Sequence, residues 1–138
     1  MSDYQSNLTK SQQVDELNAH IKAKLAPSKI HGVGVVALRN VHKGEKLYAD
    51  ILPRVYNLTD LSKLFPEIKE LILERWPSVI NGGAFISPDA RLLTFMNHSE
   101  TPSYDPVTDE LLTDIKAGEE ITEDYRTMDN WQKVFPWL

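Results

Sequence analysis

The spacing of hydrophobic residues changes several times along the chain, and each spacing predicts a different kind of element. The first thirteen residues are polar, and Val14, Leu17 and Ile21 then recur at the interval of a helix. From Ile21 onward, apolar residues alternate with lysines, which is the period of a strand. The beginning of the chain therefore predicts an N-terminal arm over residues 1–20 that is helical in part, followed by the first strand of a domain.

Apolar runs that glycines interrupt predict further strands. The stretch IHGVGVVALRNV has the pattern of a second strand, and HKGEKLYADILP that of a Lys-Gly turn leading into a third. Closer to the C-terminus, DELLTDIKAGEEITEDY predicts a strand, a Lys-Ala-Gly turn and another strand. Many short runs bounded by turn residues indicate a protein that is built mainly of β-structure.

The middle of the chain has the pattern of helices. Thr59 or Asp60 can cap a helix whose apolar positions recur every three or four residues. Pro66 has no backbone N–H and fits only the first turn of a helix. We therefore predict a short helix that ends at Phe65 and a second that begins at Pro66. The expected fold is mainly β, a β-rich α+β class, with a short helical insert at about residues 59–76.

Length and composition narrow the class of protein. The chain has 138 residues, of which 41% are hydrophobic and 25% charged, as in a typical globular domain. The absence of cysteine excludes disulfides, thiolate zinc sites and cysteine nucleophiles, and we expect a cytoplasmic protein. A net charge of −5 disfavours nucleic-acid binding and favours basic peptides or cationic ligands. No apolar run is long enough for a membrane span.

The residues that could take part in catalysis or binding each have more than one possible role when considered alone. The GVG tripeptide at residues 32–34 either brings bare backbone close to a ligand or forms a simple bulge or turn. The four histidines lack the spacing of a metal site, so we expect no metal. Ser99 follows His98 without the motif of a hydrolase nucleophile. The carboxylates of GEEITEDY either act as a catalytic acid and base or lie in a solvated turn. Tyr125 either packs in a core or presents its hydroxyl in a cleft.

Three motifs follow one another along the chain. IHGVGVVA has the pattern hydrophobic-H-G-x-G-hydrophobic-hydrophobic-A, FMNHS followed by Pro102 has F-hydrophobic-N-H-S-x-x-P, and GEEITEDY has G-E-E-hydrophobic-T-x-D-Y. In pattern and order they resemble the motifs of the SET-domain protein lysine methyltransferases, and the resemblance runs from about Ile21 to about Trp137. It implies one domain over residues 21–138. The implied fold consists of small curved sheets, with a C-terminal segment threaded, like a pseudoknot, through a loop of the preceding chain.

The resemblance also implies a site. The residues that would bind S-adenosylmethionine are His31, Gly32, Val33, Gly34, Asn97, His98 and Tyr125. Tyr125 would also be the catalytic tyrosine beside the transferred methyl group. The residues of the channel for the substrate lysine would be Tyr48, Glu123, Trp131, Phe135 and Trp137, the last three from an aromatic tail over residues 129–138. The implied enzyme methylates a lysine of a protein and releases S-adenosylhomocysteine.

The chain departs from the family pattern at this channel. Glu123 stands where the family commonly has an aromatic residue, and Asp50 lies near the usual position of a further channel tyrosine. Either carboxylate could pair with a charged lysine and oppose its deprotonation, or both could face solvent in a different strand register. The alternative function is therefore a SET-like binding module with weak or no catalysis that recognises a basic protein segment. No motif specifies the target lysine, the number of methyl groups or the oligomeric state.

Overall fold

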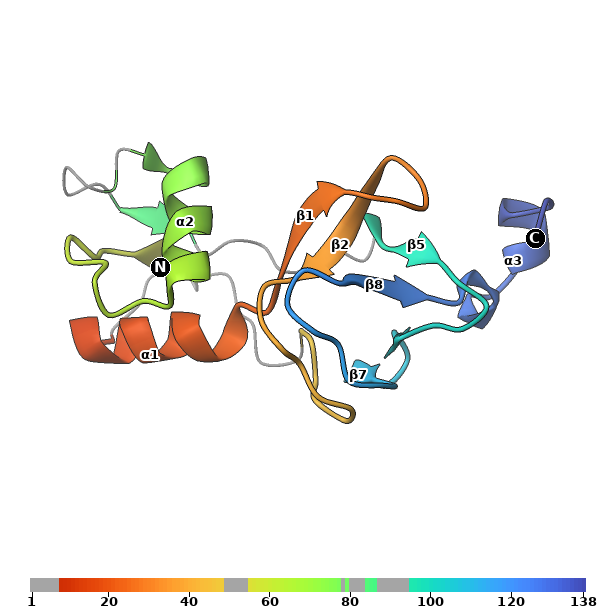
Figure 1. The fold of residues 1–138 in the computed structure, drawn as a ribbon, viewed down its shortest axis with the longest axis horizontal. Coiled ribbons are helices and arrows are strands. Elements are labelled where there is room, and N and C mark those ends of the chain that lie inside the picture. The colour runs from red at the N-terminus through yellow and green to blue at the C-terminus, as the bar shows by residue number, and fades with distance from the viewer. Residues whose placement is uncertain (1–7, 49–54, 78, 80–83, 87–94) are drawn as a thin grey trace. The chain divides into compact units, whose positions relative to one another are not determined.

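Short strands outnumber helices in the structure, a computed structural model that describes residues 8–48, 55–77, 79, 84–86 and 95–138. The fold class predicted from the sequence, mainly β with few helices, is confirmed. The elements in chain order are α1 (Lys10–His20), β1 (Ala23–Pro27), β2 (Val33–Ala37), β3 (Val55–Tyr56), α2 (Pro66–Arg75), β4 (Phe85–Ile86), β5 (Asn97–His98), β6 (Tyr104–Asp105), β7 (Glu110–Leu111), β8 (Glu120–Glu123), the 3-10 helix η3 (Tyr125–Thr127) and α3 (Trp131–Val134) (Figure 1).

The chain forms two compact units, each from two segments that are distant in sequence. Unit 1 consists of Met1–Lys22 and Asp50–Ala90, and unit 2 consists of Ala23–Ala49 and Arg91–Leu138. Unit 1 contains α1, α2 and the small β3–β4 sheet. Unit 2 contains the remaining strands, η3 and α3. All the site residues predicted from the sequence belong to unit 2.

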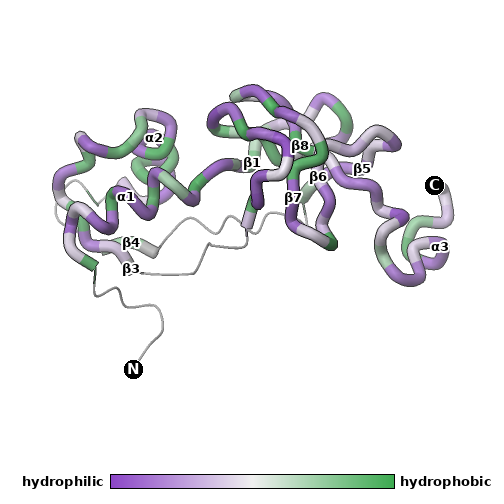
Figure 2. The backbone as a smooth tube through the Cα atoms, turned by 90° about the horizontal axis from the view of Figure 1, so that it is seen from below, coloured by the Kyte–Doolittle hydropathy of each residue, from purple (hydrophilic) through white to green (hydrophobic). Residues whose placement is uncertain are grey.

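Helix α1 of unit 1 begins earlier than its apolar face does. The Thr9 hydroxyl accepts a hydrogen bond from the Gln12 backbone N–H at 3.1 Å, and the Gln12 side chain accepts one from the Thr9 N–H at 2.9 Å. This capping box satisfies two N–H groups of the first turn, so the helix starts at Lys10. Val14 and Leu17 are buried in the core, as their spacing predicts. Hydrophobic and hydrophilic positions alternate along both α1 and α2 (Figure 2).

Helix α2 begins at Pro66, as predicted, but the short helix expected before it is a turn. The Asp60 carboxylate accepts a hydrogen bond from the Ser62 N–H at 2.9 Å, and the Asn18 side chain accepts one from the Phe65 N–H at 2.8 Å. The first bond takes an N–H near the start of the expected helix and the second takes one at its end, which favours a turn over a helix. The prediction of a helix that ends at Phe65 is therefore wrong. None of the described helices combines the length and hydrophobicity needed to cross a membrane.

A four-stranded sheet in the order β1-β2-β8-β5 forms the centre of unit 2 (Figure 1). β2 pairs with β1 and β8 in antiparallel fashion, whereas β5 runs parallel to β8. Val35 of β2 lies opposite Ile121 of β8, and both are fully buried. In its described residues the predicted third strand forms a bridge between Lys46 and Glu110, and its remainder from residue 49 onward lies outside the described residues.

The chain that follows β5 contacts β8 repeatedly. The Ser99 N–H donates to the Glu123 carbonyl at 2.9 Å, and the Ser103 N–H donates to the Thr122 carbonyl at 3.1 Å. The Thr122 N–H in turn donates to the Ser103 hydroxyl at 3.0 Å. β8 is thus held by β2 on one side and by residues 97–103 on the other. This places its C-terminal end, where Tyr125 follows, beside β5; the threading of this segment through a loop stays a prediction.

Candidate functional site

A cluster of polar atoms joins the turn between β1 and β2 to β5 and β8. Its centre is the side-chain nitrogen of Asn97, which is within hydrogen-bond distance of four oxygen atoms: Glu120 Oε2 at 2.9 Å, Ser28 Oγ at 3.0 Å, and the backbone carbonyls of His31 and Val33 at 3.1 Å each. The Ser28 hydroxyl also lies 2.7 and 2.9 Å from the two Glu120 carboxylate oxygens. An amide nitrogen carries two hydrogens, so the cluster has more acceptors than donors.

Ser28 organises the turn that carries the GVG tripeptide. Its hydroxyl accepts hydrogen bonds from the N–H groups of Ile30 at 2.9 Å and His31 at 3.1 Å. Its own N–H donates to the Gly32 carbonyl at 2.7 Å. Gly32 has a φ of 49°, in the left-handed region that favours glycine. The side chain of His31 is exposed, so only the backbone of this residue takes part in the cluster.

The two glycines of the tripeptide have different roles. Nothing lies within 4 Å of where a Cβ at Gly32 would be. A Cβ at Gly34 would instead lie 2.5 Å from Glu120 Oε2 and 3.1 Å from Asn97 Nδ2. Gly34 is therefore required for close approach, and what approaches its backbone is the protein's own polar cluster. Val33 between them is 48% exposed.

Tyr125 is held at both its backbone and its hydroxyl. Its hydroxyl donates to the Met96 carbonyl at 2.8 Å, and its N–H donates to Nδ1 of His98 at 3.0 Å. Burial, together with the Glu123 carboxylate, raises the pKa of the Tyr125 hydroxyl above its ordinary value of 10.0. The hydroxyl therefore stays protonated at neutral pH. It lies at the end of β8, next to the backbone that enters β5.

The carboxylate of Asp124 caps the short helix η3 that Tyr125 begins. It accepts a hydrogen bond from the Arg126 N–H at 2.9 Å and forms an ion pair with the Arg126 guanidinium at 2.8 Å. These bonds lower the pKa of Asp124 to about 2.

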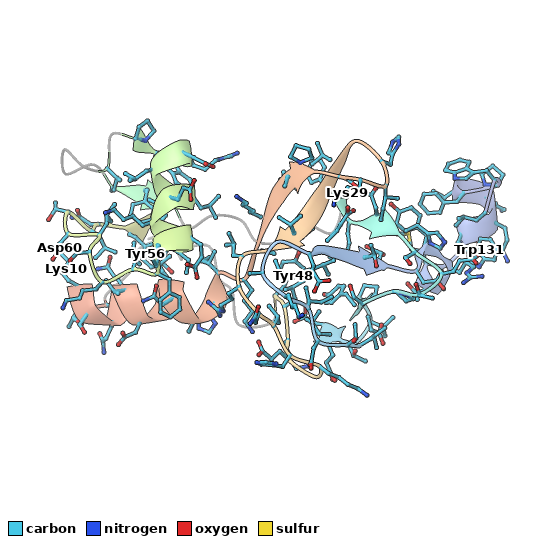
Figure 3. The ribbon with its side chains drawn as sticks, viewed as in Figure 1. Lys10, Lys29, Tyr48, Tyr56, Asp60 and Trp131 are labelled. Carbon is cyan, nitrogen blue, oxygen red and sulfur yellow. The ribbon has the colours of Figure 1, made fainter. Side chains whose placement is uncertain are left out.

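The C-terminal tail covers Tyr125 through one of its aromatic residues. The ring of Phe135 stacks on the Tyr125 ring with a centroid distance of 4.5 Å, and Trp137 packs edge-on against Phe135 at 5.6 Å. Trp137 is 74% exposed. Trp131 is the first residue of α3 (Figure 3), and the ring contacts found within the described residues do not include it. Of the three predicted channel aromatics in the tail, Phe135 is the one with a ring contact to Tyr125 within the described residues.

The two other predicted channel residues, Tyr48 and Glu123, are both buried. Tyr48 packs edge-on against Tyr104 with a ring distance of 6.0 Å, and the Tyr104 hydroxyl donates to Asp109 at 2.6 Å. Glu123 is 2% exposed, and burial raises the pKa of its carboxyl to about 7. The hypothesis that Glu123 points to solvent is therefore wrong. Asp50, for which the same alternatives were open, lies outside the described residues.

Sequence reasoning missed three contributors to the site. No motif singles out Ser28, Glu120 is one of several carboxylates expected either in acid–base catalysis or in a solvated turn, and the Met96 carbonyl belongs to a residue without reactive chemistry. Ser28 and Glu120 are 92 positions apart, so no local pattern links them. A serine three residues before a histidine whose N–H it caps was the only local signal.

A cavity formed by described residues lies elsewhere, within unit 1. Its volume is about 520 Å³, and Lys10 and Asp60, two of its lining residues, are marked in Figure 3. None of the predicted site residues lines it; its walls are Lys10, Ser11, Val14, Asp15, Leu58, Thr59, Asp60 and Lys63. Among the described residues, no three His, Asp or Glu side chains lie close enough together to hold a metal ion.

Comparison with known proteins gives one family and a set of distant structures. The family model of the SET domain matches residues 32–126. A Plasmodium falciparum protein classed provisionally as a histone methyltransferase aligns at 18% identity with a TM-score of 0.39, over 75% of this chain and 92% of that one. A chain of a humanized mutant of the Chaetomium thermophilum Polycomb Repressive Complex 2 aligns at 17% identity with a TM-score of 0.40, over 81% of this chain and 16% of that one. None of the curated proteins matches the sequence.

Proposed function

The chain belongs to the SET-domain family, and we propose that it is a protein lysine methyltransferase that uses S-adenosylmethionine. One observation carries this proposal: the Tyr125 hydroxyl donates at 2.8 Å to the carbonyl of Met96, the residue that directly precedes Asn97 and its polar cluster. Two fixed oxygens beside a group of hydrogen-bond acceptors suit a reactant that carries positive charge.

The polar cluster has the chemistry to hold the amino-acid end of this cofactor. Its acceptors outnumber its donors, and they include a carboxylate, Glu120, and the carbonyls of His31 and Val33. An α-ammonium group brings three N–H donors and a positive charge, which would satisfy the surplus acceptors. The residues present therefore fit S-adenosylmethionine, with Asn97 and Glu120 as the side chains that would hold it.

When bound, S-adenosylmethionine supplies a methyl group on a positively charged sulfur. The protein's part is to align the two reactants and to place oxygen lone pairs around the methyl group as it moves. Tyr125 is suited to this role because Met96 fixes its hydroxyl, His98 fixes its backbone, and Phe135 covers its ring. Its hydroxyl stays protonated at neutral pH, so it presents a neutral oxygen beside the sulfonium. The target lysine, with an ordinary pKa of about 10.4, must lose a proton before it reacts.

The substrate we propose is a lysine in a basic segment of a protein. The net charge of −5 on this chain would attract such a segment, and the attraction would weaken as salt screens it.

A calorimetric titration of S-adenosylmethionine into the purified protein tests the cofactor part of the proposal. Asn97→Ala removes the centre of the polar cluster, and we expect it to weaken binding about 10- to 100-fold, the effect of losing a hydrogen bond to a charged group. Ser28→Ala provides a second, smaller truncation of the same cluster. Circular dichroism checks that each variant is folded. A folded wild-type protein without measurable binding contradicts the proposal, and the binding-module alternative then takes its place.

Tyr125→Phe tests the catalytic part. The substitution removes the hydroxyl and keeps the ring that Phe135 covers. We expect cofactor binding within about two-fold of wild type and methyl transfer reduced about 100-fold or more, because the oxygen acts mainly on the transition state. Transfer is measured with tritium-labelled S-adenosylmethionine and poly-L-lysine. Equal transfer rates for wild type and variant would show that Tyr125 is not catalytic.

A further inference from the structure

Glu123 is a buried acid without a partner in the described part of the chain. The residue is 2% exposed and lies on β8 two residues after the fully buried Ile121. Its backbone carbonyl accepts a hydrogen bond from Ser99, but its carboxyl has neither a hydrogen bond nor an ion pair with any described residue. A buried carboxylate costs several kcal/mol unless a donor or a cation compensates it. Such a group therefore either holds a proton or awaits a positively charged ligand.

The carboxyl lies on the same side of the chain as the catalytic tyrosine. Asp124 between them has extended backbone angles, φ −98° and ψ 113°. Side chains two positions apart along extended backbone project to one side, so Glu123 and Tyr125 share a side. The pKa of the Tyr125 hydroxyl is raised by burial and then by the Glu123 carboxylate, and that of Tyr104 by burial, its bond to Asp109 and, more weakly, Glu123. Glu123 is therefore within electrostatic range of both hydroxyls.

The hydroxyls around this carboxyl point to other acceptors. The Tyr104 hydroxyl donates to Asp109 at 2.6 Å, and the Tyr125 hydroxyl donates to the Met96 carbonyl at 2.8 Å. Neither hydroxyl therefore donates to the Glu123 carboxyl, although both lie within its electrostatic range.

Two further titratable groups lie close to this setting. Tyr48 packs edge-on against Tyr104, and His98, the register partner of Glu123 on β5, uses Nδ1 to accept the Tyr125 N–H. Neither supplies a cation to the carboxyl, because no ion pair joins Glu123 to any described residue.

The ligand that fits a buried carboxylate among aromatic rings is an alkylammonium group. A lysine side chain carries its charge at the end of a slender apolar stem, and aromatic faces attract such a cation. Building on the proposed methyltransferase function, we propose that Glu123 binds the ε-ammonium group of the target lysine and accepts one of its protons. It is then the general base of the reaction.

The proton and electron balance of this step is complete. One N–H proton passes from the lysine nitrogen to a Glu123 carboxylate oxygen, which leaves a neutral amine. The nitrogen lone pair forms the new N–C bond with the methyl group, the C–S bond of S-adenosylmethionine breaks, and its electron pair stays on sulfur. The products are a methylammonium, S-adenosylhomocysteine and a protonated Glu123, which returns its proton to water when the product leaves. A carboxyl with a pKa of about 7 exchanges protons in both directions at neutral pH, as general-base catalysis requires.

A carboxyl titration on the folded protein tests the binding step without any turnover. The protein is labelled with carbon-13 glutamate, and Glu123→Gln identifies the signal that belongs to Glu123. n-Butylammonium chloride serves as the probe, with potassium chloride at equal ionic strength as the control. Binding of the cation to the ionised carboxyl lowers the titration midpoint by about one pH unit when the amine stands ten-fold above its Kd. A midpoint that n-butylammonium and potassium leave equal overturns the proposal.

Methyl transfer to poly-L-lysine tests the proton-transfer step. For wild type we expect kcat to rise through about pH 7 and then level. Glu123→Gln keeps the shape of the side chain but cannot accept a proton, so we expect kcat to fall about 100-fold and this rise to disappear. Glu123→Asp restores a carboxyl and should recover part of the rate. Glu100→Gln is the matched control, because it makes the same change at a side chain that is 80% exposed.

The two experiments separate this proposal from the methyltransferase function on which it rests. Transfer that is equally fast and equally pH-dependent in wild type and Glu123→Gln overturns the role of Glu123 and leaves the methyltransferase function standing. Absence of transfer by the wild-type protein, together with a shift of the Glu123 midpoint by n-butylammonium, contradicts the methyltransferase and supports the amine site.

Discussion

Replacing Glu123 by glutamine measures what the buried carboxyl costs the folded protein. Desolvation raises its pKa from the ordinary 4.5 to about 7. The folded protein therefore holds this proton more tightly than the unfolded chain does. Between pH 4.5 and about 7 the unfolded chain has released the proton while the folded protein keeps it, so the free energy of unfolding falls as pH rises and levels above pH 7.

The size of this effect follows from the same two values. The two pKa values differ by about 2.5, which corresponds to an upper value of about 3 to 4 kcal/mol at about 1.4 kcal/mol per pKa unit. Most of it, about 2 to 3 kcal/mol, falls between pH 5 and pH 8. Glutamine has nearly the same volume and no charge, so Glu123→Gln removes this contribution and leaves the packing of β8 in place. The cost of burying its neutral amide is the same at both pH values.

Urea unfolding at pH 5 and pH 8 tests the reasoning. We expect the free energy of unfolding of the wild-type protein to fall by about 2 to 3 kcal/mol more than that of Glu123→Gln between the two pH values, because all other ionisations cancel in the difference. Glu100→Gln, which changes an exposed carboxyl, should lose as much as wild type. An equal loss in wild type and Glu123→Gln would refute the idea that this carboxyl is desolvated in the folded protein.

Three further predictions concern packing and capping. Gly34→Ala places a Cβ 2.5 Å from a carboxylate oxygen, so it should lower the free energy of unfolding in urea by about 1–3 kcal/mol and weaken S-adenosylmethionine binding. In Gly32→Ala the new Cβ meets nothing within 4 Å, so this variant should lose about 1 kcal/mol because of its positive φ and bind S-adenosylmethionine as wild type does. Equal binding by both variants would contradict this. Phe135→Ala uncovers Tyr125, so the Tyr125 pKa, which burial raises, should return toward 10.0 in an ultraviolet titration against Tyr125→Phe; an unchanged midpoint would show that the stack does not bury the hydroxyl. Thr9→Ala removes the capping box of α1 and should lower the free energy of unfolding by about 1 kcal/mol, and no change would mean that the cap is dispensable.

Much of the fold could be predicted from local patterns in the sequence. Strands β1, β2 and β8 occur where the apolar period changes, and α2 begins at Pro66 because proline fits the first turn of a helix. The fold class and the family were also readable, since the three motifs are contiguous stretches whose residue types are visible in order. The motifs also predict that Asn97 and Tyr125 belong to a common site, and this stays a prediction.

Tertiary structure alone decided which side chains meet. The partners of Asn97 include residues 69 and 23 positions away, Ser28 and Glu120, and only the pairing of β2 and β5 with β8 brings them together. The turn before Pro66 depends on a side chain from α1, so its helical pattern was misleading. Among the tail aromatics, the fold selects Phe135 for the contact with Tyr125.

Glu123 shows most clearly what the sequence determines and what only the tertiary structure decides. Its carboxyl group and its distance of two residues from Tyr125 are visible in the sequence, but its protonation is not. Burial raises the pKa of this carboxyl, and burial arises when β8 lies between β2 on one side and residues 97–103 on the other. Residue type and local period are properties of neighbours along the chain, whereas desolvation and strand register depend on residues that only folding brings close.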